Sequence, residues 1–224
     1  MSQHLQKEIE NLKKNLLTMG SVVEDMVYLA TKSVVRRDTR MAQEIISRDL
    51  EVDEMEVNIE EECLKILALH QPVAIDLRFI IAVLKINSDL ERVGDLAVNI
   101  AERSLFLSGQ EDICLTFNIT AMAEKVESML TRSIDSLVNM DVPQAYRIRQ
   151  EDDLVDAYNR DMYEKVKEEL ALHPESANCL LHLLSVGRHL ERVADHATNI
   201  AEDVIYLVDA QIVRHTPEDF MEED

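Results

Sequence analysis

Apolar residues recur along the chain at alternating steps of four and three positions, the spacing of a helix face that packs against antiparallel neighbours. The first such stretch begins at Leu5 and continues to Ala30. It predicts one helix over residues 3–36, whose buried stripe is formed by Leu5, Ile9, Leu12, Leu16, Met19, Val23, Met26 and Ala30.

Residues suited to the start of a helix divide the rest of the chain. Asp38 and Asp141 have side chains that accept hydrogen bonds from a first helical turn, and Pro72 and Pro174 suit first-turn positions. With the apolar pattern, they predict helices over residues 3–36, 38–70, 72–109, 117–140, 141–173 and 174–213.

The composition agrees with a helical protein. Only four glycines and four prolines occur among the 224 residues, and aromatic residues make up 4%, which disfavours strands and tight turns. Hydrophobic residues make up 46%, enough for a globular core. The fold class is therefore predicted to be all-α.

The third and sixth predicted helices contain nearly the same sequence. Residues 90–102 read LERVGDLAVNIAE and residues 190–202 read LERVADHATNIAE, with ten of the thirteen positions identical. Such a repeat indicates a duplicated unit. We expect two tandem three-helix bundles of antiparallel helices, residues 1–109 and 110–213, followed by a frayed acidic tail over residues 214–224.

The charge of the chain limits its partners. There are 44 acidic residues against 23 basic ones, a net charge of -21. This charge repels the phosphate backbone of nucleic acids and anionic lipid head groups, and it attracts cations and basic protein surfaces. Nucleic acid and direct membrane insertion are therefore not expected.

The chain is expected to work in the reducing cytoplasm. Charged residues interrupt the apolar positions of residues 1–17, and the longest apolar run, residues 79–84, is too short to cross a bilayer. Three scattered cysteines, Cys63, Cys114 and Cys179, lack the spacing of a thiolate metal site or a disulfide framework.

Each copy of the repeated motif carries a stripe of acidic residues. On a helical wheel the stripe lies opposite the apolar face, so we expect it to point away from the core toward solvent. Its members are Glu91, Asp95, Asn99 and Glu102 in the first copy and Glu191, Asp195, Asn199 and Glu202 in the second. The preceding helix of each copy adds an acidic pair at i, i+4 spacing, namely Asp49 with Asp53 and Asp152 with Asp156.

These stripes favour a metal site. Like charges at i, i+4 spacing destabilise a helix slightly, no lysine lies within the stripes, and the arrangement occurs twice. Several carboxylate oxygens with an amide oxygen suit a hard cation. Two alternatives stay open: a merely solvated surface, and ion pairs from Arg92 and Arg192 to a facing helix.

The doubled motif resembles the PhoU family, accessory proteins of the phosphate-specific transport system, and the resemblance covers residues 5–210. The pairs at residues 49–53 and 152–156 match the acidic pairs of that family. The resemblance implies six helices in two bundles that hold multinuclear metal clusters, with iron, zinc, magnesium or manganese. The ligands that it implies are Asp49, Asp53, Glu91, Asp95, Asn99, Asp152, Asp156, Glu191, Asp195 and Asn199.

The resemblance also implies a function. Family members are not enzymes, and they act as negative regulators of phosphate uptake and of the phosphate-starvation response. They link the ATPase subunit of the phosphate ABC transporter to a membrane sensor histidine kinase. A homodimer in the cytoplasm is expected as well.

One position departs from the family pattern, which commonly has histidine after the motif aspartate in both copies. Here Leu96 stands in the first copy and His196 in the second, so we expect the two clusters to differ in metal choice or affinity. His196 is expected either to support a metal ligand or to lie on the surface without a role.

Two other classes of protein were weighed against this one. A catalytic dimetal bundle of the ferritin type is disfavoured, because no histidine of the chain follows a glutamate by three residues. A metal-free helical adaptor, or a PhoU-like paralogue that serves another transporter, remains the alternative.

Overall fold

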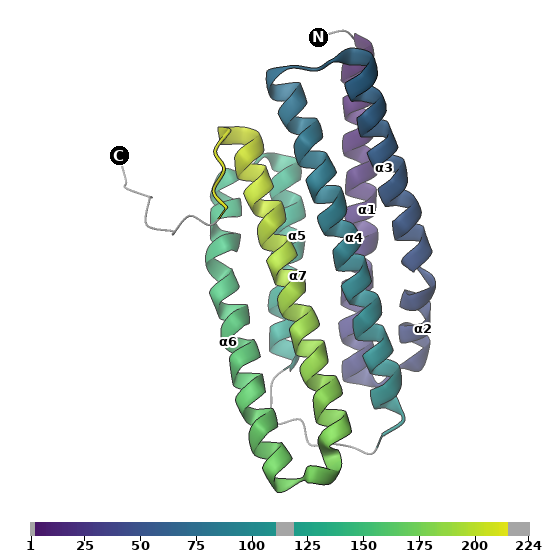
Figure 1. The fold of residues 1–224 in the computed structure, drawn as a ribbon, viewed down its shortest axis with the longest axis vertical. Coiled ribbons are helices and arrows are strands. Elements are labelled where there is room, and N and C mark those ends of the chain that lie inside the picture. Colours follow the sequence, from purple (N-terminus) through teal and green to yellow (C-terminus); the bar gives the residue numbers. More distant parts are fainter. Residues whose placement is uncertain (1–2, 111–118, 215–224) are drawn as a thin grey trace, which may run out of the picture.

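The structure is a computed structural model that describes residues 3–110 and 119–214 (Figure 1). Within these residues there are helices and no strand. In chain order they are α1 (Gln3–Arg36), α2 (Thr39–Ser47), α3 (Asp49–His70), α4 (Ala74–Ser108), α5 (Ile119–Asn139), α6 (Val142–Leu172), the short 3-10 helix η1 (Pro174–Ser176) and α7 (Ala177–Asp209). The predicted all-α class is confirmed.

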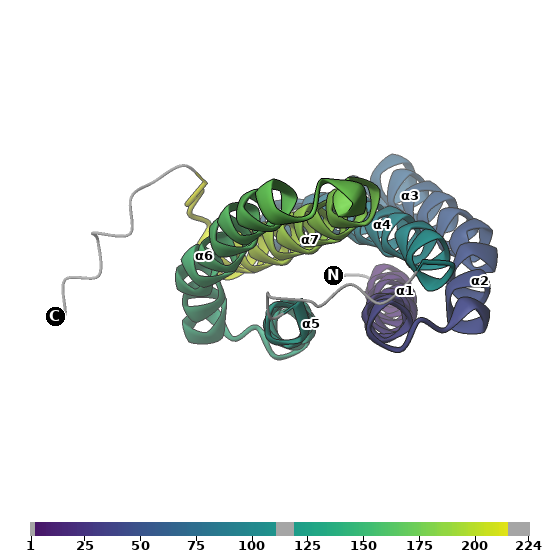
Figure 2. The same ribbon diagram turned by 90° about the horizontal axis from the view of Figure 1, so that it is seen from below.

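The helices form two groups that lie side by side, α1 to α4 and α5 to α7 (Figure 1). Figure 2 shows α6, α7, α4 and α3 in one curved layer, with α1 and α5 beneath it. The groups meet where α4 packs against α7 and α1 packs against α5. The predicted repeat limits at residues 109 and 213 stay predictions. Nearly all of the segment between the predicted helices over residues 72–109 and 117–140, and nearly all of the tail, lie outside the described residues.

The core follows the stripe predicted for α1. Leu12, Met19 and Met26 are fully buried, and the other predicted positions are buried or packed against the core. The equivalent apolar faces of α4 and α7 bury Leu90 and Leu190. The apolar period of the sequence therefore decides which side of each helix faces inward.

The two groups repeat each other in backbone detail as well as in sequence. Arg37 and Met140, 103 positions apart in the chain, both have a φ of 53° at the end of the first helix of their group. The next residue in each case is an aspartate, whose backbone N–H donates to a carbonyl five residues earlier, at 3.1 Å for Asp38 and 2.9 Å for Asp141. This left-handed helix end reverses the chain in the same way twice.

The predicted caps are confirmed. The Asp38 carboxylate accepts from the backbone N–H of Arg40 at 2.9 Å and of Met41 at 3.2 Å, and Asp141 accepts from Gln144 at 3.0 Å. Each aspartate satisfies donors that the first turn of a helix leaves without a partner.

The prediction of one helix over residues 38–70 is wrong, because the helix breaks at Arg48 into α2 and α3. The hydroxyl of Ser47 donates to the carbonyl of Glu44 at 2.6 Å, a local bond that competes with the helical ladder. Asp49 and Glu51 then occupy the first turn of α3, where the helix dipole stabilises negative charge. As a result, Asp49 begins a new helix.

Three helix limits also differ from the predictions. Pro72 does not lie in the first turn of α4, which begins at Ala74 after a turn with positive φ at Gln71 and Ala74. Pro174 lies in η1, so α7 begins only at Ala177. The last helix ends at Asp209, before the predicted Val213, because Ala210 adopts a left-handed conformation with φ 57°.

A close approach between α3 and α4 depends on Gly94. A Cβ at this position would lie 3.2 Å from Cγ1 of Val52, a tight contact. The equivalent residue of the second group is Ala194, which is buried on α7. The first group therefore brings the acidic pair of α3 to α4 by leaving out a methyl group.

We expect Gly94→Ala to show strong coupling with Val52→Ala. Alanine favours a helix by about 1 kcal/mol over glycine, but overpacking a core costs roughly 1–3 kcal/mol. Gly94→Ala should therefore fail to stabilise the native chain and should stabilise the Val52→Ala variant. Chemical denaturation of the two singles and the double measures the coupling. An equal gain in both backgrounds would show that α3 and α4 are not in tight contact there.

Candidate metal centre

The acidic residues of α3 and α4 face one another where these two helices pack. We call the set Asp49, Asp53, Glu91, Asp95 and Asn99 the first acidic seam. The set Asp152, Asp156, Glu191, Asp195 and Asn199, contributed by α6 and α7, is the second acidic seam. Each seam thus joins an acidic pair on one helix to the repeated motif on the next.

The charges of the first acidic seam repel one another across the two helices. Desolvation, followed by the charges of Asp53, Asp95 and Glu102, raises the pKa of Asp49. Desolvation and then Asp53 of α3 raise the pKa of Asp95. Desolvation, Asp95, Glu56 and Asp53 likewise raise the pKa of Glu91. These carboxylates are less easily ionised because the fold gathers negative charge there.

The second acidic seam shows the same effect more strongly. Desolvation, followed by the charges of Asp195, Asp156, Asp153 and Glu191, raises the pKa of Asp152 from 3.8 to about 6. Desolvation and then Asp195 and Asp156 also raise the pKa of Glu191, although nearby arginines oppose the shift. A cation in the seam would remove the part of these shifts that repulsion between carboxylates adds to desolvation.

The prediction that the stripes face directly away from the protein into solvent is wrong in part. Asp95 and Asp195 are exposed, but Glu91, Asn99 and Asp49 are half-buried. The difference arises because a helical wheel treats one helix alone, whereas α3 and α6 lie beside the stripes of α4 and α7. The stripes therefore belong to the contacts between helices as well as to the surface.

No ion pair among the described residues neutralises the first acidic seam, although the charge of Arg92 opposes the rise in the pKa of Glu91. Within residues 3–110 and 119–214, no ion pair involves Asp49, Asp53, Glu91 or Asp95. Arg92 and Arg192, the ion-pair partners considered from the sequence, are exposed and form no ion pair in this same part of the chain. The described residues therefore give no support to the interpretation that Arg92 and Arg192 form ion pairs with a facing helix.

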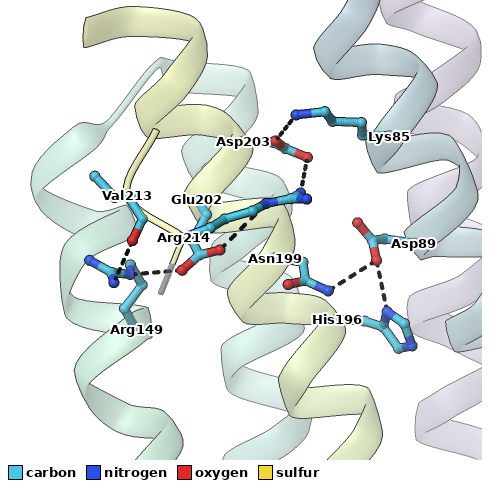
Figure 3. A network of polar contacts seen from close by, with 9 residues as sticks. All are labelled: Lys85, Asp89, Arg149, His196, Asn199, Glu202, Asp203, Val213 and Arg214. Atoms are coloured by element: carbon cyan, nitrogen blue, oxygen red, sulfur yellow. Dashed lines mark hydrogen bonds and ion pairs between the residues drawn. The ribbon is translucent and has the colours of Figure 1, made fainter. Parts of the chain in front are cut away.

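Arginine side chains neutralise part of the negative charge at the edge of the second acidic seam. Asp156 lies 3.6 Å from Arg160 in an exposed i, i+4 pair. Glu202, which continues the stripe, is held by Arg149 at 3.2 Å and Arg214 at 3.7 Å (Figure 3). Glu102 of the first group is exposed, and within the described part of the chain its one ion pair is with its neighbour Arg103, at 3.8 Å. The two seams are therefore similar in donors but different in surrounding charge.

The donor atoms of both seams suit a hard cation. They offer carboxylate oxygens, and the Asn99 amide, whose nitrogen donates to the Asp95 carbonyl at 2.8 Å, keeps its oxygen available. Among the described residues, however, no three seam carboxylates bring oxygens within 4.8 Å of one another. A bound cation would have to draw these side chains inward against their present repulsion.

His196 is buried, so the expectation that it lies on the surface is wrong. Its Nδ1 lies 2.8 Å from Oδ1 of Asp89 on α4, and the Asn199 amide donates to the same oxygen at 3.3 Å (Figure 3). His196 therefore joins the two groups of helices, and Asn199 connects the second seam to this contact. In the first group the equivalent Leu96 is buried without such a bond.

The sequence reasoning missed a buried ionic contact between the groups. Asp203 of α7, 2% exposed, accepts from Lys85 of α4 at 3.0 Å and from Arg214 at 3.1 Å (Figure 3). Desolvation still raises the pKa of Asp203 above its ordinary range. The sequence did contain a signal for this contact, because the charge directly after the repeated motif differs between the copies: it is Arg103 in the first and Asp203 in the second.

We expect Asp152→Asn to stabilise the metal-free protein at neutral pH. Between pH 3.8 and about 6 the folded chain keeps a proton on Asp152 that the unfolded chain releases, so stability falls as pH rises through this window. After discounting for solvent screening, the variant should gain about 1 kcal/mol above that window. Thermal melts in chelator across pH 4–7.5 measure the change.

The matched control for this variant is Glu168→Gln, which removes one exposed carboxylate of α6 outside the seam. It should leave the pH profile unchanged. A melting temperature of Asp152→Asn equal to or below that of the native chain at pH 7.5 would contradict the repulsion described for the second seam.

We expect His196→Leu, which copies the first group, to destabilise the chain by roughly 2–4 kcal/mol, because it leaves the buried Asp89 carboxylate short of a partner. Adding Asp89→Asn should recover part of the loss, since the remaining group is neutral. His173→Leu, at an exposed histidine, is the control. Denaturant titration measures the free energy of unfolding of all three variants. A loss below about 0.5 kcal/mol in His196→Leu would show that the contact between His196 and Asp89 does not stabilise the fold.

Comparison with known proteins identifies relatives along nearly the whole chain. The family model described as the PhoU domain matches twice, over residues 16–104 and 119–204. The phosphate-specific transport system accessory protein PhoU homolog of Aquifex aeolicus is 38% identical over 213 residues, 93% of this chain and 95% of that protein.

Two solved structures share the fold. The crystal structure of PhoU from Pseudomonas aeruginosa matches with a TM-score of 0.89 and 34% identity, over 92% of this chain and 99% of that one. The phosphate transport system regulatory protein PhoU from Streptococcus pneumoniae matches with a TM-score of 0.84 and 30% identity, over 93% of this chain and 99% of that one.

Proposed function

The chain belongs to the PhoU family, and from this premise we propose that it is a regulatory accessory protein of phosphate transport and not an enzyme. The observation that carries the proposal is the pair of acidic seams, one in each segment that the family model matches. Both seams arise from the same helix packing in the two groups. A function common to the family should therefore involve this duplicated feature.

The finer part of the proposal concerns metal ions. Each seam holds a cluster of cations, with iron, zinc, magnesium or manganese as candidates. The residues that would bind them are Asp49, Asp53, Glu91, Asp95 and Asn99 in the first seam and Asp152, Asp156, Glu191, Asp195 and Asn199 in the second. The raised pKa values of Asp152 and Glu191 support this proposal, because neighbouring carboxylates add to the effect of desolvation and a cation would offset that added charge.

The second part concerns signalling. The protein would bind the ATPase subunit of the phosphate ABC transporter and a membrane sensor histidine kinase. In this way it would keep the phosphate-starvation response off when phosphate is plentiful. The net charge of -21 supports docking through basic surfaces of such partners. The protein would act in the cytoplasm as a homodimer. No helix among the described residues is long and apolar enough to cross a membrane.

A regulator fits the site better than a catalyst does. In a dimetal bundle of the ferritin type the ligands project into the bundle core, with a glutamate three residues before each histidine. Here Asp95 and Asp195 are exposed at the side of the helices, and the one histidine beside a seam, His196, is bonded to Asp89. The seams therefore offer cation binding and a charged surface.

The test combines Asp95→Ala with Asp195→Ala, one carboxylate from each seam. Protein stripped with chelator is titrated with Mg²⁺, Mn²⁺, Zn²⁺ and Fe²⁺ by calorimetry, and circular dichroism monitors the helices. The native chain should bind at least one ion per seam, and the double variant should bind none there with its helix content unchanged. In cells the variant should weaken repression of phosphate-responsive genes at high phosphate.

The matched control is Asp25→Ala with Asp135→Ala, which removes two exposed carboxylates from α1 and α5 outside the seams. It should retain both metal binding and repression. If millimolar cations do not bind the native chain at the seams, the metal-free adaptor becomes the better account. If the seam variant loses metal but represses normally, metal binding and regulation are separate properties.

A further inference from the structure

A group of side chains with different chemistry lies at one end of the first helix group. His4 and Glu8 are one turn apart near the start of α1, so they share a face of that helix. His70 is the last residue of α3 and reaches the same place from a separate helix. None of the three belongs to an acidic seam, and the regulatory function proposed above makes no use of them.

The three side chains converge on a common centre. Nε2 of His70 lies 2.6 Å from Oε2 of Glu8, and Nε2 of His4 lies 3.6 Å from Oε1 of the same carboxylate. One possible ligand atom from each residue lies within 4.8 Å of the other two. Within residues 3–110 and 119–214, no other three histidine, cysteine or acidic residues meet this condition.

This geometry is close to that of a zinc site. Bonds of about 2.0–2.2 Å from zinc to imidazole nitrogen and carboxylate oxygen, in tetrahedral arrangement, place the ligand atoms roughly 3.3 Å apart. The His4 side chain is 74% exposed and can rotate, whereas those of Glu8 and His70 are each 17% exposed and are held by the protein. Glu8 and His70 therefore already lie side by side and would only have to exchange their hydrogen bond for the ion, while His4 has freedom to close the site.

The surroundings leave room for an ion and a water ligand. A cleft of about 300 Å³ opens beside His4 and Glu8, and Lys65 and Glu62 form part of its wall. Lys65 Nζ lies 3.7 Å from the Glu8 carboxylate, and its side chain is 63% exposed. An exposed lysine in a surface ion pair contributes little energy, so an ion can displace it into solvent.

We propose that His4, Glu8 and His70 form a Zn²⁺ site that clamps the start of α1 to the end of α3. Two imidazole nitrogens and one carboxylate oxygen suit zinc, whereas the all-oxygen seams suit harder cations. The clamp is therefore chemically distinct from the seams. It also fixes the first turn of α1, which lacks an acidic residue to stabilise the helix dipole.

The competing account is a plain hydrogen bond from His70 to Glu8 with His4 as a passive neighbour. The two accounts differ in the role of His4, because the hydrogen bond needs only Glu8 and His70. His4→Ala therefore separates them while leaving the folded contact in place. His173→Ala is the matched control, because His173 lies beside Glu175 at 3.2 Å near the end of α6 and is not part of the three-residue group.

The experiment uses the full chain, stripped with chelator and titrated with ZnCl₂ while the histidine side-chain nitrogens are followed by NMR. Zn²⁺ should shift Nε2 of His4 and His70, and it should raise the melting temperature. His4→Ala should lose affinity at this site by at least about tenfold, as even supporting partners of metal ligands commonly do. His173→Ala should bind as the native chain does.

Two results would overturn the proposal. One is Zn²⁺ that binds the protein without moving the His4 and His70 signals, which would place the zinc elsewhere on the protein. The other is a His4→Ala variant that keeps the native affinity and the native gain in melting temperature. Glu8→Gln serves as a second variant, since it keeps the side-chain volume and should also lose the site.

Discussion

The packing of α4 against α7 is the contact on which the rest of the molecule depends. The two helices run antiparallel, and each buries the apolar side of the repeated motif, with Leu90 and Leu190 both at most 1% exposed (Figure 1). Across this contact lie the Lys85–Asp203 ion pair and the His196–Asp89 bond. Buried polar pairs of this kind favour one register between helices, because any other register leaves a charge without a partner.

Once α4 and α7 are fixed, the position of the acidic seams follows. One side of each helix is used in the contact between the groups, so the acidic stripe lies on the side that α3 or α6 approaches. The fold thereby brings carboxylates from two helices together and leaves those of the first seam without basic partners in the described parts of the chain. The raised pKa of Asp152, about 6, reports the electrostatic cost of this arrangement. A protein that retains such a cost twice has a use for the charge, and cation binding is the use that offsets the cost directly.

Local sequence signals predicted those features of the fold that are determined within a single helix. The apolar stripe of α1 and the caps at Asp38 and Asp141 follow from periodicity and from side-chain chemistry near the chain itself. The break at Arg48 was not predictable in this way, because Ser47 and Asp49 are also tolerated within a continuous helix. Neither was the hydrogen bond of His196, since its partner Asp89 lies on another helix, 107 positions away in the chain. The group of His4, Glu8 and His70 forms only when α1 packs against α3. Its closest pair, Glu8 and His70, is 62 positions apart in the chain.

The central claim is that each acidic seam binds cations with carboxylates from two helices. Crystals of the full chain grown with Mn²⁺, measured for anomalous scattering, test it most directly. The account predicts strong peaks between Asp53 and Asp95 in the first seam and between Asp152 and Asp195 in the second. Anomalous peaks confined to other surfaces, with the seam carboxylates still apart, would contradict it.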